Sequence, residues 1–260
     1  MSGHVAEPWL KLVGGLGAVF VLFQLLGHVL NSDRGQAGLS IAVAVIAALV
    51  AVERLLFRQS LGSAMSSLGL GRPSALGVAA AVGLSALLVL VIPAYAHVRG
   101  VQVVPYPGWA WLLPGLFAQA GIAEEALFRG YLFRRLRQDR SFWNAALLAM
   151  IPFVVVHLFM FATLPWTIAL AAVVLATVIC FPLAHLFELG GNTIWAPAIL
   201  HFTVQGSIKV LELPGDALMP VVWMAASATI PYFAFFLHRV AAPLSGAVAT
   251  SARRPPPETP

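Results

Sequence analysis

The chain has 260 residues, of which 60% are hydrophobic and only 10% are charged, and its formal net charge is +5. This composition is typical of membrane proteins. It argues against a soluble all-helical protein, because the long apolar segments lack the polar faces that water would require.

Eight apolar segments follow one another along the chain, each close to the roughly 20 residues that a helix needs to cross a bilayer. They are residues 9–30, 39–57, 75–97, 110–133, 142–160, 167–187, 193–211 and 221–238. Turn-forming clusters such as "NSDRGQAG" and "LPGD" separate them. The sequence therefore predicts an all-α, polytopic integral membrane protein with about eight transmembrane helices. We expect one membrane-embedded domain over residues 1–240 and a disordered cytoplasmic tail over residues 241–260.

The basic residues indicate which side of the membrane each loop faces. With the N-terminus placed in the cytoplasm, the outer segments hold only Arg34, Arg99 and Lys209. The inner segments then hold Lys11, Arg54, Arg58, Arg72, Arg134, Arg135, Arg137, Arg140, Arg239, Arg253 and Arg254. We therefore expect a multi-pass membrane protein with both termini cytoplasmic. The excess of Arg over Lys, with abundant Ala, Gly and Leu, indicates a GC-rich bacterial genome and hence the cell (inner) membrane of a bacterium. Because topology accounts for the positive charge, no nucleic-acid partner is expected.

The segment "GIAEEALFRGYLFRRL", residues 121–136, places three charged residues inside the fourth apolar segment. Inserting an ionised side chain near the middle of a transmembrane helix costs about 2.5 to 3.5 kcal/mol of free energy, so these groups need partners. Glu125 and Arg129 are four residues apart and share a helix face, which predicts a structural ion pair. Glu124 is rotated by roughly 100° and lacks that partner, which makes it the candidate reactive group.

Two histidines are expected to meet Glu124. The chain runs 16 residues from Glu124 to Arg140 and 16 residues from Ser141 to His157. Antiparallel helices of equal length place Glu124 and His157 at the same height. His201, with Gln205 one turn later, reaches a similar depth on another helix, roughly 10 to 15 Å inside the cytoplasmic surface. Three helices thus bring polar groups to one buried level.

The order of these motifs resembles a known family. Glu-Glu-x-x-x-Arg, then Phe-x-x-x-His, then "GGNTIWAPAIL" followed by His-x-x-x-polar, are similar to the CAAX-processing and bacteriocin-processing (CPBP, or Abi) intramembrane proteases. This group contains the Ras-converting CAAX endopeptidase, and the resemblance covers roughly residues 110–210.

The resemblance implies an endopeptidase that cleaves a membrane-associated protein or peptide precursor. It implies that Glu124 and His157 activate a water, that His201 and the residue at position 205 stabilise the oxyanion, and that Glu125 and Arg129 support them. The family usually has Asn where this chain has Gln205.

Alternatives remain open at this point. Glu124, His157 and His201 also form a two-His, one-carboxylate set of the kind that binds catalytic zinc. We favour a mechanism without metal or other cofactor, because using Glu124 as a ligand leaves only Glu125, held by Arg129, as base. Gln205 leaves open a catalytically weak or inactive member that acts as a membrane binding protein. Buried Glu and His residues also mark proton-coupled transporters, although no inverted repeat is evident.

Overall fold

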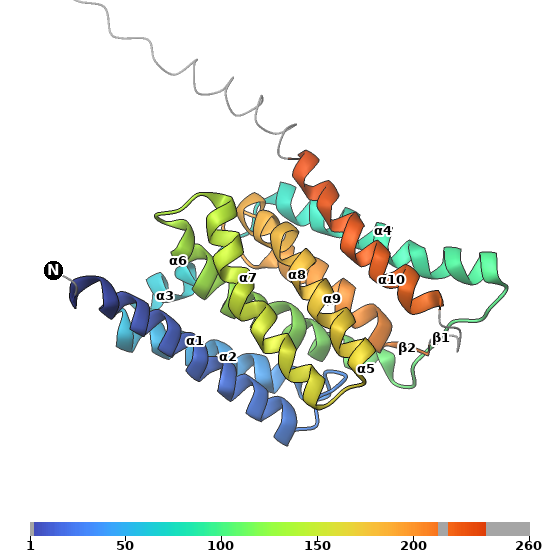
Figure 1. Ribbon diagram of the computed structural model, residues 1–260, viewed down its shortest axis with the longest axis horizontal. Coiled ribbons are helices and arrows are strands. Elements are labelled where there is room, and N and C mark those ends of the chain that lie inside the picture. Colours follow the sequence, from blue (N-terminus) through green and yellow to red (C-terminus); the bar gives the residue numbers. More distant parts are fainter. Residues whose placement is uncertain (1–2, 213–217, 238–260) are drawn as a thin grey trace, which may run out of the picture.

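The computed structural model describes residues 3–212 and 218–237, so the tail expected over residues 241–260 lies outside the described residues. Figure 1 shows a bundle of long helices, with N-terminal α1 and α2 on one side and α4 and α10 on the other. The expected all-α, multi-pass membrane fold is confirmed.

The helices of the described residues are α1 (Gly3–Val29), α2 (Gly38–Leu56), α3 (Leu61–Ser67), α4 (Ala75–Arg99), α5 (Trp109–Leu116), α6 (Arg134–Arg137), α7 (Phe142–Leu158), α8 (Trp166–Leu189), α9 (Trp195–Lys209) and α10 (Leu218–Thr229). Two π-helices, η1 (Phe117–Ala123) and η2 (Ala126–Phe133), continue α5, and the 3-10 turns η3 (Phe159–Ala162) and η4 (Ile230–Phe233) follow α7 and α10. The strands β1 (Val104–Pro105) and β2 (Leu211–Glu212) pair antiparallel.

Six helices of the described residues are long and apolar enough to cross a membrane, and they occupy six of the eight predicted positions. The other two predicted spans are also helical but differ in form. Residues 110–133 form α5, η1 and η2 in succession, and residues 193–211 contain α9, which has only 15 residues. The sequence pattern therefore located both segments, but the first has a largely π-helical backbone and the second is an α-helix shorter than a full span.

The segment formed by α5, η1 and η2 lies in the middle of the bundle. η1 packs against α2 and α9, and η2 packs against α1 and α7. Glycine permits the closest approach: a Cβ on Gly115 would overlap the carbonyl oxygen of Gly35, and one on Gly130 would overlap the backbone of Leu68. Backbone thus meets backbone at both ends of the segment.

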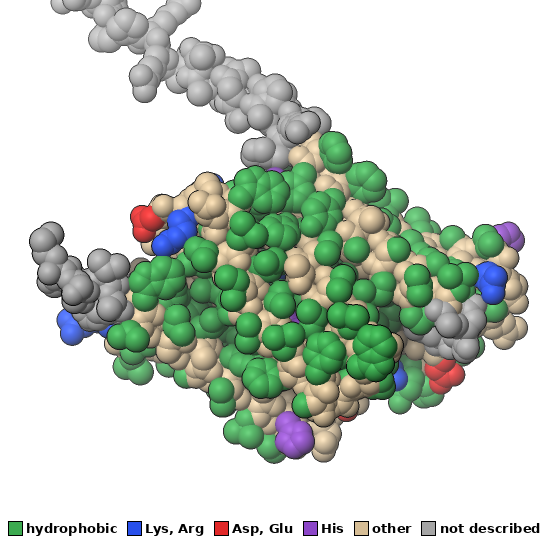
Figure 2. Space-filling view, viewed as in Figure 1, with side chains coloured by type: hydrophobic (Ala, Val, Ile, Leu, Met, Phe, Trp, Pro, Cys, Tyr) green, Lys and Arg blue, Asp and Glu red, His purple; other side chains and the backbone are tan. Residues whose placement is uncertain are grey.

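Apolar side chains cover the outside of the bundle. Leu10 is 72% exposed, Val43 70% and Trp111 88%, and Figure 2 shows hydrophobic side chains across the visible face, with charged groups near its edges. An apolar surface of this extent would be a liability in water, whereas lipid chains would cover it. The surface therefore agrees with a protein embedded in a bilayer.

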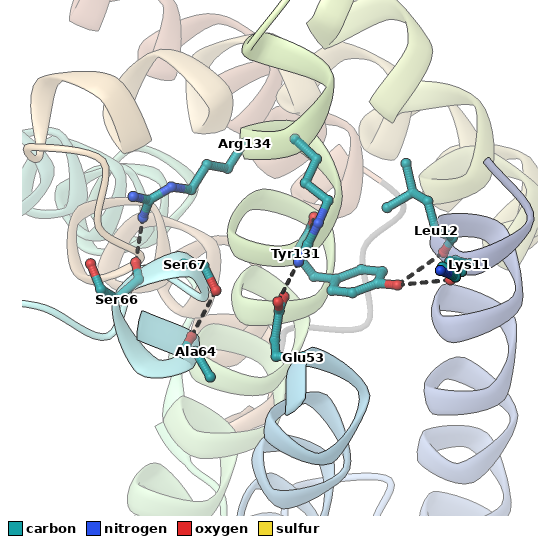
Figure 3. A network of polar contacts seen from close by, with 9 residues as sticks. Lys11, Leu12, Glu53, Ala64, Ser66, Ser67, Tyr131 and Arg134 are labelled. Carbon is teal, nitrogen blue, oxygen red and sulfur yellow. Dashed lines mark hydrogen bonds and ion pairs between the residues drawn. The ribbon is translucent and has the colours of Figure 1, made fainter. Parts of the chain in front are cut away.

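We call residues 121–136, which carry the Glu-Glu-x-x-x-Arg motif, the motif segment. A polar network joins α1, α2 and α3 to the arginine-rich end of this segment (Figure 3). The buried carboxylate of Glu53 forms an ion pair with Arg135, whose guanidinium carbon lies 4.1 Å from the ring centre of Phe57. The hydroxyl of Tyr131 lies 3.2 Å from the carbonyl oxygens of Lys11 and Leu12. These contacts fix the end of the segment that carries the two glutamates.

Candidate active site

Glu124 and Glu125 lie between the two π-helices. The amide of Glu124 donates to the carbonyl of Gln119, and that of Arg134 donates to Arg129, both five residues back. Long π-helices are rare, and π-helical turns occur frequently at functional sites. The irregular backbone is tolerated at this depth because neighbouring helices enclose it.

Glu125 is fully buried and holds two partners through one oxygen. Its Oε1 lies 3.2 Å from Nη1 of Arg129, so the ion pair expected from the spacing is present. The same oxygen lies 2.6 Å from Nδ1 of His201 on α9, a contact that spacing along one helix does not predict. A carboxylate accepts, so Nδ1 of His201 carries the proton in this contact. Glu125 therefore fixes both the orientation and the tautomer of His201.

Glu124 has a different environment. Its side chain is 16% exposed, and its Oε2 lies 3.7 Å from Nε2 of His201. Among the ion pairs of the described residues, Glu124 contacts only this histidine, whereas Glu125 contacts both Arg129 and His201. Glu124 is thus the more accessible of the two carboxylates and the less constrained by charge pairing.

Gln205 contacts His201 directly. Its amide nitrogen lies 2.8 Å from Nε2 of His201 and donates to it when that nitrogen is unprotonated. The sequence indicated that both side chains would face a common third group, whereas here the amide is directed at the imidazole itself. Nε2 of His201 is therefore flanked by the amide of Gln205 and the carboxylate of Glu124.

Phe153 connects Arg129 with both histidines. Its ring centre lies 4.4 Å from the guanidinium carbon of Arg129, 4.9 Å from the ring of His157 and 6.0 Å from the ring of His201. Its carbonyl oxygen accepts a 2.7 Å hydrogen bond from Nδ1 of His157. This bond leaves Nε2 of His157 available as an acceptor. The ring of Phe153 was part of the sequence motif, but its contacts could not be read from the sequence.

The structure therefore gathers all six predicted residues in one region. Glu124, Glu125 and Arg129 come from the motif segment, His157 from α7, and His201 and Gln205 from α9. His157 joins this group through the ring of Phe153, which contacts both imidazoles and the guanidinium of Arg129. Two carboxylates, two imidazoles and one guanidinium thus share a low-dielectric interior, where their interactions are strong.

The side chains do not fit a zinc site in this arrangement. Among residues 3–212 and 218–237, no group of three or more His, Cys, Asp or Glu side chains converges as metal ligands would. Nε2 of His201, the nitrogen that faces Glu124, is 2.8 Å from the amide nitrogen of Gln205, which is not a zinc ligand. No step of the chemistry below is therefore assigned to a metal.

Fold and site together define a class: a multi-pass helical membrane protein with an ionisable Glu/His/Arg centre buried between its helices. Residues 106–207 match the model of one family, described as type II CAAX prenyl endopeptidase Rce1-like. The match includes every motif residue and confirms the resemblance to the CAAX-processing proteases. No curated protein matches the sequence. The family is one of proteases, which supports an intramembrane endopeptidase role.

Proposed function

We propose that this protein is a glutamate-dependent intramembrane endopeptidase. It hydrolyses a peptide bond in a membrane-associated substrate, either a CAAX-type tail or a peptide precursor. One observation carries the proposal: of two adjacent carboxylates, Glu125 is buried and held by Arg129 and His201, whereas Glu124 is partly exposed beside the same histidine. A carboxylate free of an ion pair with arginine is available to accept a proton.

Glu124 and His157 are suited to hold a water molecule. The carboxylate of Glu124 and the free Nε2 of His157 are both acceptors, and each takes one O–H of the water. The oxygen lone pair is then directed at the carbonyl carbon of the substrate. As the oxygen attacks, Glu124 takes the proton, and it later returns this proton to the leaving amine when the C–N bond breaks.

His201 and Gln205 are suited to stabilise the oxyanion. With a proton on both ring nitrogens of His201, Nδ1 donates to Glu125 and Nε2 becomes a donor. The amide of Gln205 then no longer donates to Nε2, and its N–H is free to bind the oxyanion as a second donor.

We place the arginine-rich end, with α3 and α6, in the cytoplasm, and the protein in the cell membrane of a bacterium. The outer end then holds β1, β2 and the loop between α1 and α2. This orientation rests on the distribution of Lys and Arg.

Comparison of membrane peptidomes tests the proposal. Cells that produce the wild-type protein are compared with cells that produce Glu124→Gln, and with a control that carries Glu212→Gln on exposed β2. Cleaved peptides present in the wild type and the control, with intact precursors in Glu124→Gln, would support it. Identical peptidomes in all three would reject it.

Two alternatives have their own tests. Stoichiometric zinc in the purified protein, lost together with activity on chelation, would replace the metal-free mechanism. The position of Gln205 against His201 also favours a second candidate, a membrane binding protein with weak or no catalysis. Substrate capture without turnover by the wild-type protein would establish that function.

A further inference from the structure

A cavity of about 330 Å³ lies beside the start of α7, at the arginine-rich end of the bundle. It is lined by Arg140, Asn144, Leu147 and Leu148. Asn144, Leu147 and Leu148 are spaced by three or four residues and share one face of α7, whereas Arg140 lies in the turn just before its N-cap, Ser141. The two leucines lie about one turn further into the bundle than Asn144. The cavity is therefore polar at the membrane surface and apolar toward the bilayer interior.

The guanidinium of Arg140 lies at the mouth of this cavity. Its carbon is 5.1 Å from the ring centre of Trp9 on α1, and tryptophan is enriched at the depth of lipid headgroups. This contact joins α1 to the turn between α6 and α7. Arg140 is thus held at the membrane–water interface.

Among the described side chains, Arg140 has no carboxylate partner. Neighbouring arginines pair with carboxylates, Arg135 with Glu53 and Arg137 with Glu188. Within the described part of the chain, Arg140 forms no ion pair, and its Nη1 donates only to the carbonyl of Leu136 at 3.4 Å. A cation beside a hollow lined by polar and apolar side chains is suited to an anion with a hydrocarbon chain.

We propose that this cavity binds an anionic phospholipid. Arg140 and the amide of Asn144 bind phosphate oxygens, for which the guanidinium fork is well matched. One acyl chain lies along Leu147 and Leu148, both of which are exposed to lipid, at 46% and 38%. A zwitterionic lipid is disfavoured, because its own cation would approach Arg140. The cavity does not include Glu124 or the histidines, so this binding is independent of peptide hydrolysis.

Native mass spectrometry of the full-length protein in detergent tests the proposal, with dioleoyl phosphatidylglycerol titrated against dioleoyl phosphatidylcholine. Wild-type protein is expected to retain phosphatidylglycerol preferentially. Arg140→Gln is expected to bind it about fivefold more weakly, the effect of one cation near a lipid surface. Arg72→Gln, which removes an exposed arginine of another inner loop, is the matched control and should bind as the wild type does.

Two further experiments distinguish a specific lipid-binding site from nonspecific charge attraction. Leu147→Trp fills the apolar part of the cavity while leaving Arg140 in place, and it should also weaken phosphatidylglycerol binding. An excess of inorganic phosphate should not displace the lipid, because phosphate lacks the acyl chain. The proposal is overturned if Arg140→Gln and Arg72→Gln have equal effects, if Leu147→Trp binds as the wild type does, or if inorganic phosphate displaces the lipid.

Discussion

The carboxylate of Glu125 contacts the imidazole of His201, with Oε1 2.6 Å from Nδ1, although the two residues lie 76 positions apart in the chain. Both side chains are buried. The same carboxylate holds Arg129 on its own helix. One buried group therefore sets the position of α9 relative to the motif segment, and with it the position of Nε2 of His201 beside Glu124.

Glu125→Gln is expected to lower both stability and activity. The substitution leaves the buried guanidinium of Arg129 without its counter-charge, and breaking a buried pair costs about 3 to 5 kcal/mol. Thermal unfolding in detergent and peptide cleavage are measured on the same preparation. A Glu125→Gln protein that is as stable as the wild type but inactive would instead make Glu125 the reactive group.

Phe153→Leu is expected to reduce activity more than stability. The variant keeps an apolar side chain but loses the ring that packs against Arg129 and both histidines, so the imidazoles shift. Misplacement of a reacting group by about 1 Å costs roughly a hundredfold in rate. The measurements are kcat, KM and the unfolding temperature.

Phe128→Leu is the control for this prediction. Phe128 is buried and its ring centre lies 4.9 Å from that of Phe153, but no ring contact joins it to a histidine among the described residues. It should lose stability with little loss of kcat. If both variants lose activity in proportion to stability, Phe153 only packs the core.

Gln205→Ala is expected to lower kcat by about 10² to 10³ with little change in KM, as removal of an oxyanion donor does. Thr203→Ala, which removes a hydroxyl bonded to the carbonyl of Ile199 on the same helix, is the control. Unchanged turnover in Gln205→Ala would exclude a role for the amide. A sharp increase in turnover for Gln205→Asn would show that the longer side chain makes this enzyme slow.

Glu53 and Arg135 form an ion pair and are expected to act as a coupled pair. Glu53→Gln alone should destabilise the protein, because Arg135 stays packed between Phe57 and Tyr131 without its carboxylate. In a double-mutant cycle with Arg135→Gln, a coupling energy of about 0.5 to 3 kcal/mol is expected from unfolding measurements. Strict additivity of the two substitutions would contradict the pairing.

Features that depend on one stretch of sequence could be predicted. The positions and lengths of the apolar segments predicted where the helices lie. The four-residue spacing of Glu125 and Arg129 predicted their ion pair. The equal chain lengths from Glu124 to Arg140 and from Ser141 to His157 indicated that His157 would lie at the level of Glu124. Local periodicity and helix rise carry this information, because they need no knowledge of how distant helices pack.

Features that depend on packing between distant helices could not be predicted. The spacing assigned Glu125 to Arg129 alone, and gave no sign that the same oxygen also binds His201. The hydroxyl of Ser32 donates to the side chain of Gln119 at 2.8 Å, across 87 residues of chain. The π-helical backbone around Glu124 likewise lacks a distinct apolar period in so short a stretch.

The most direct test of the central claim is the rate at which purified Glu124→Gln cleaves a peptide identified from the membrane comparison, set beside the wild-type rate. Loss of a positioned general base predicts a fall of at least about a hundredfold, with an unchanged unfolding temperature. Cleavage by Glu124→Gln at the wild-type rate would contradict the assignment of water activation to Glu124.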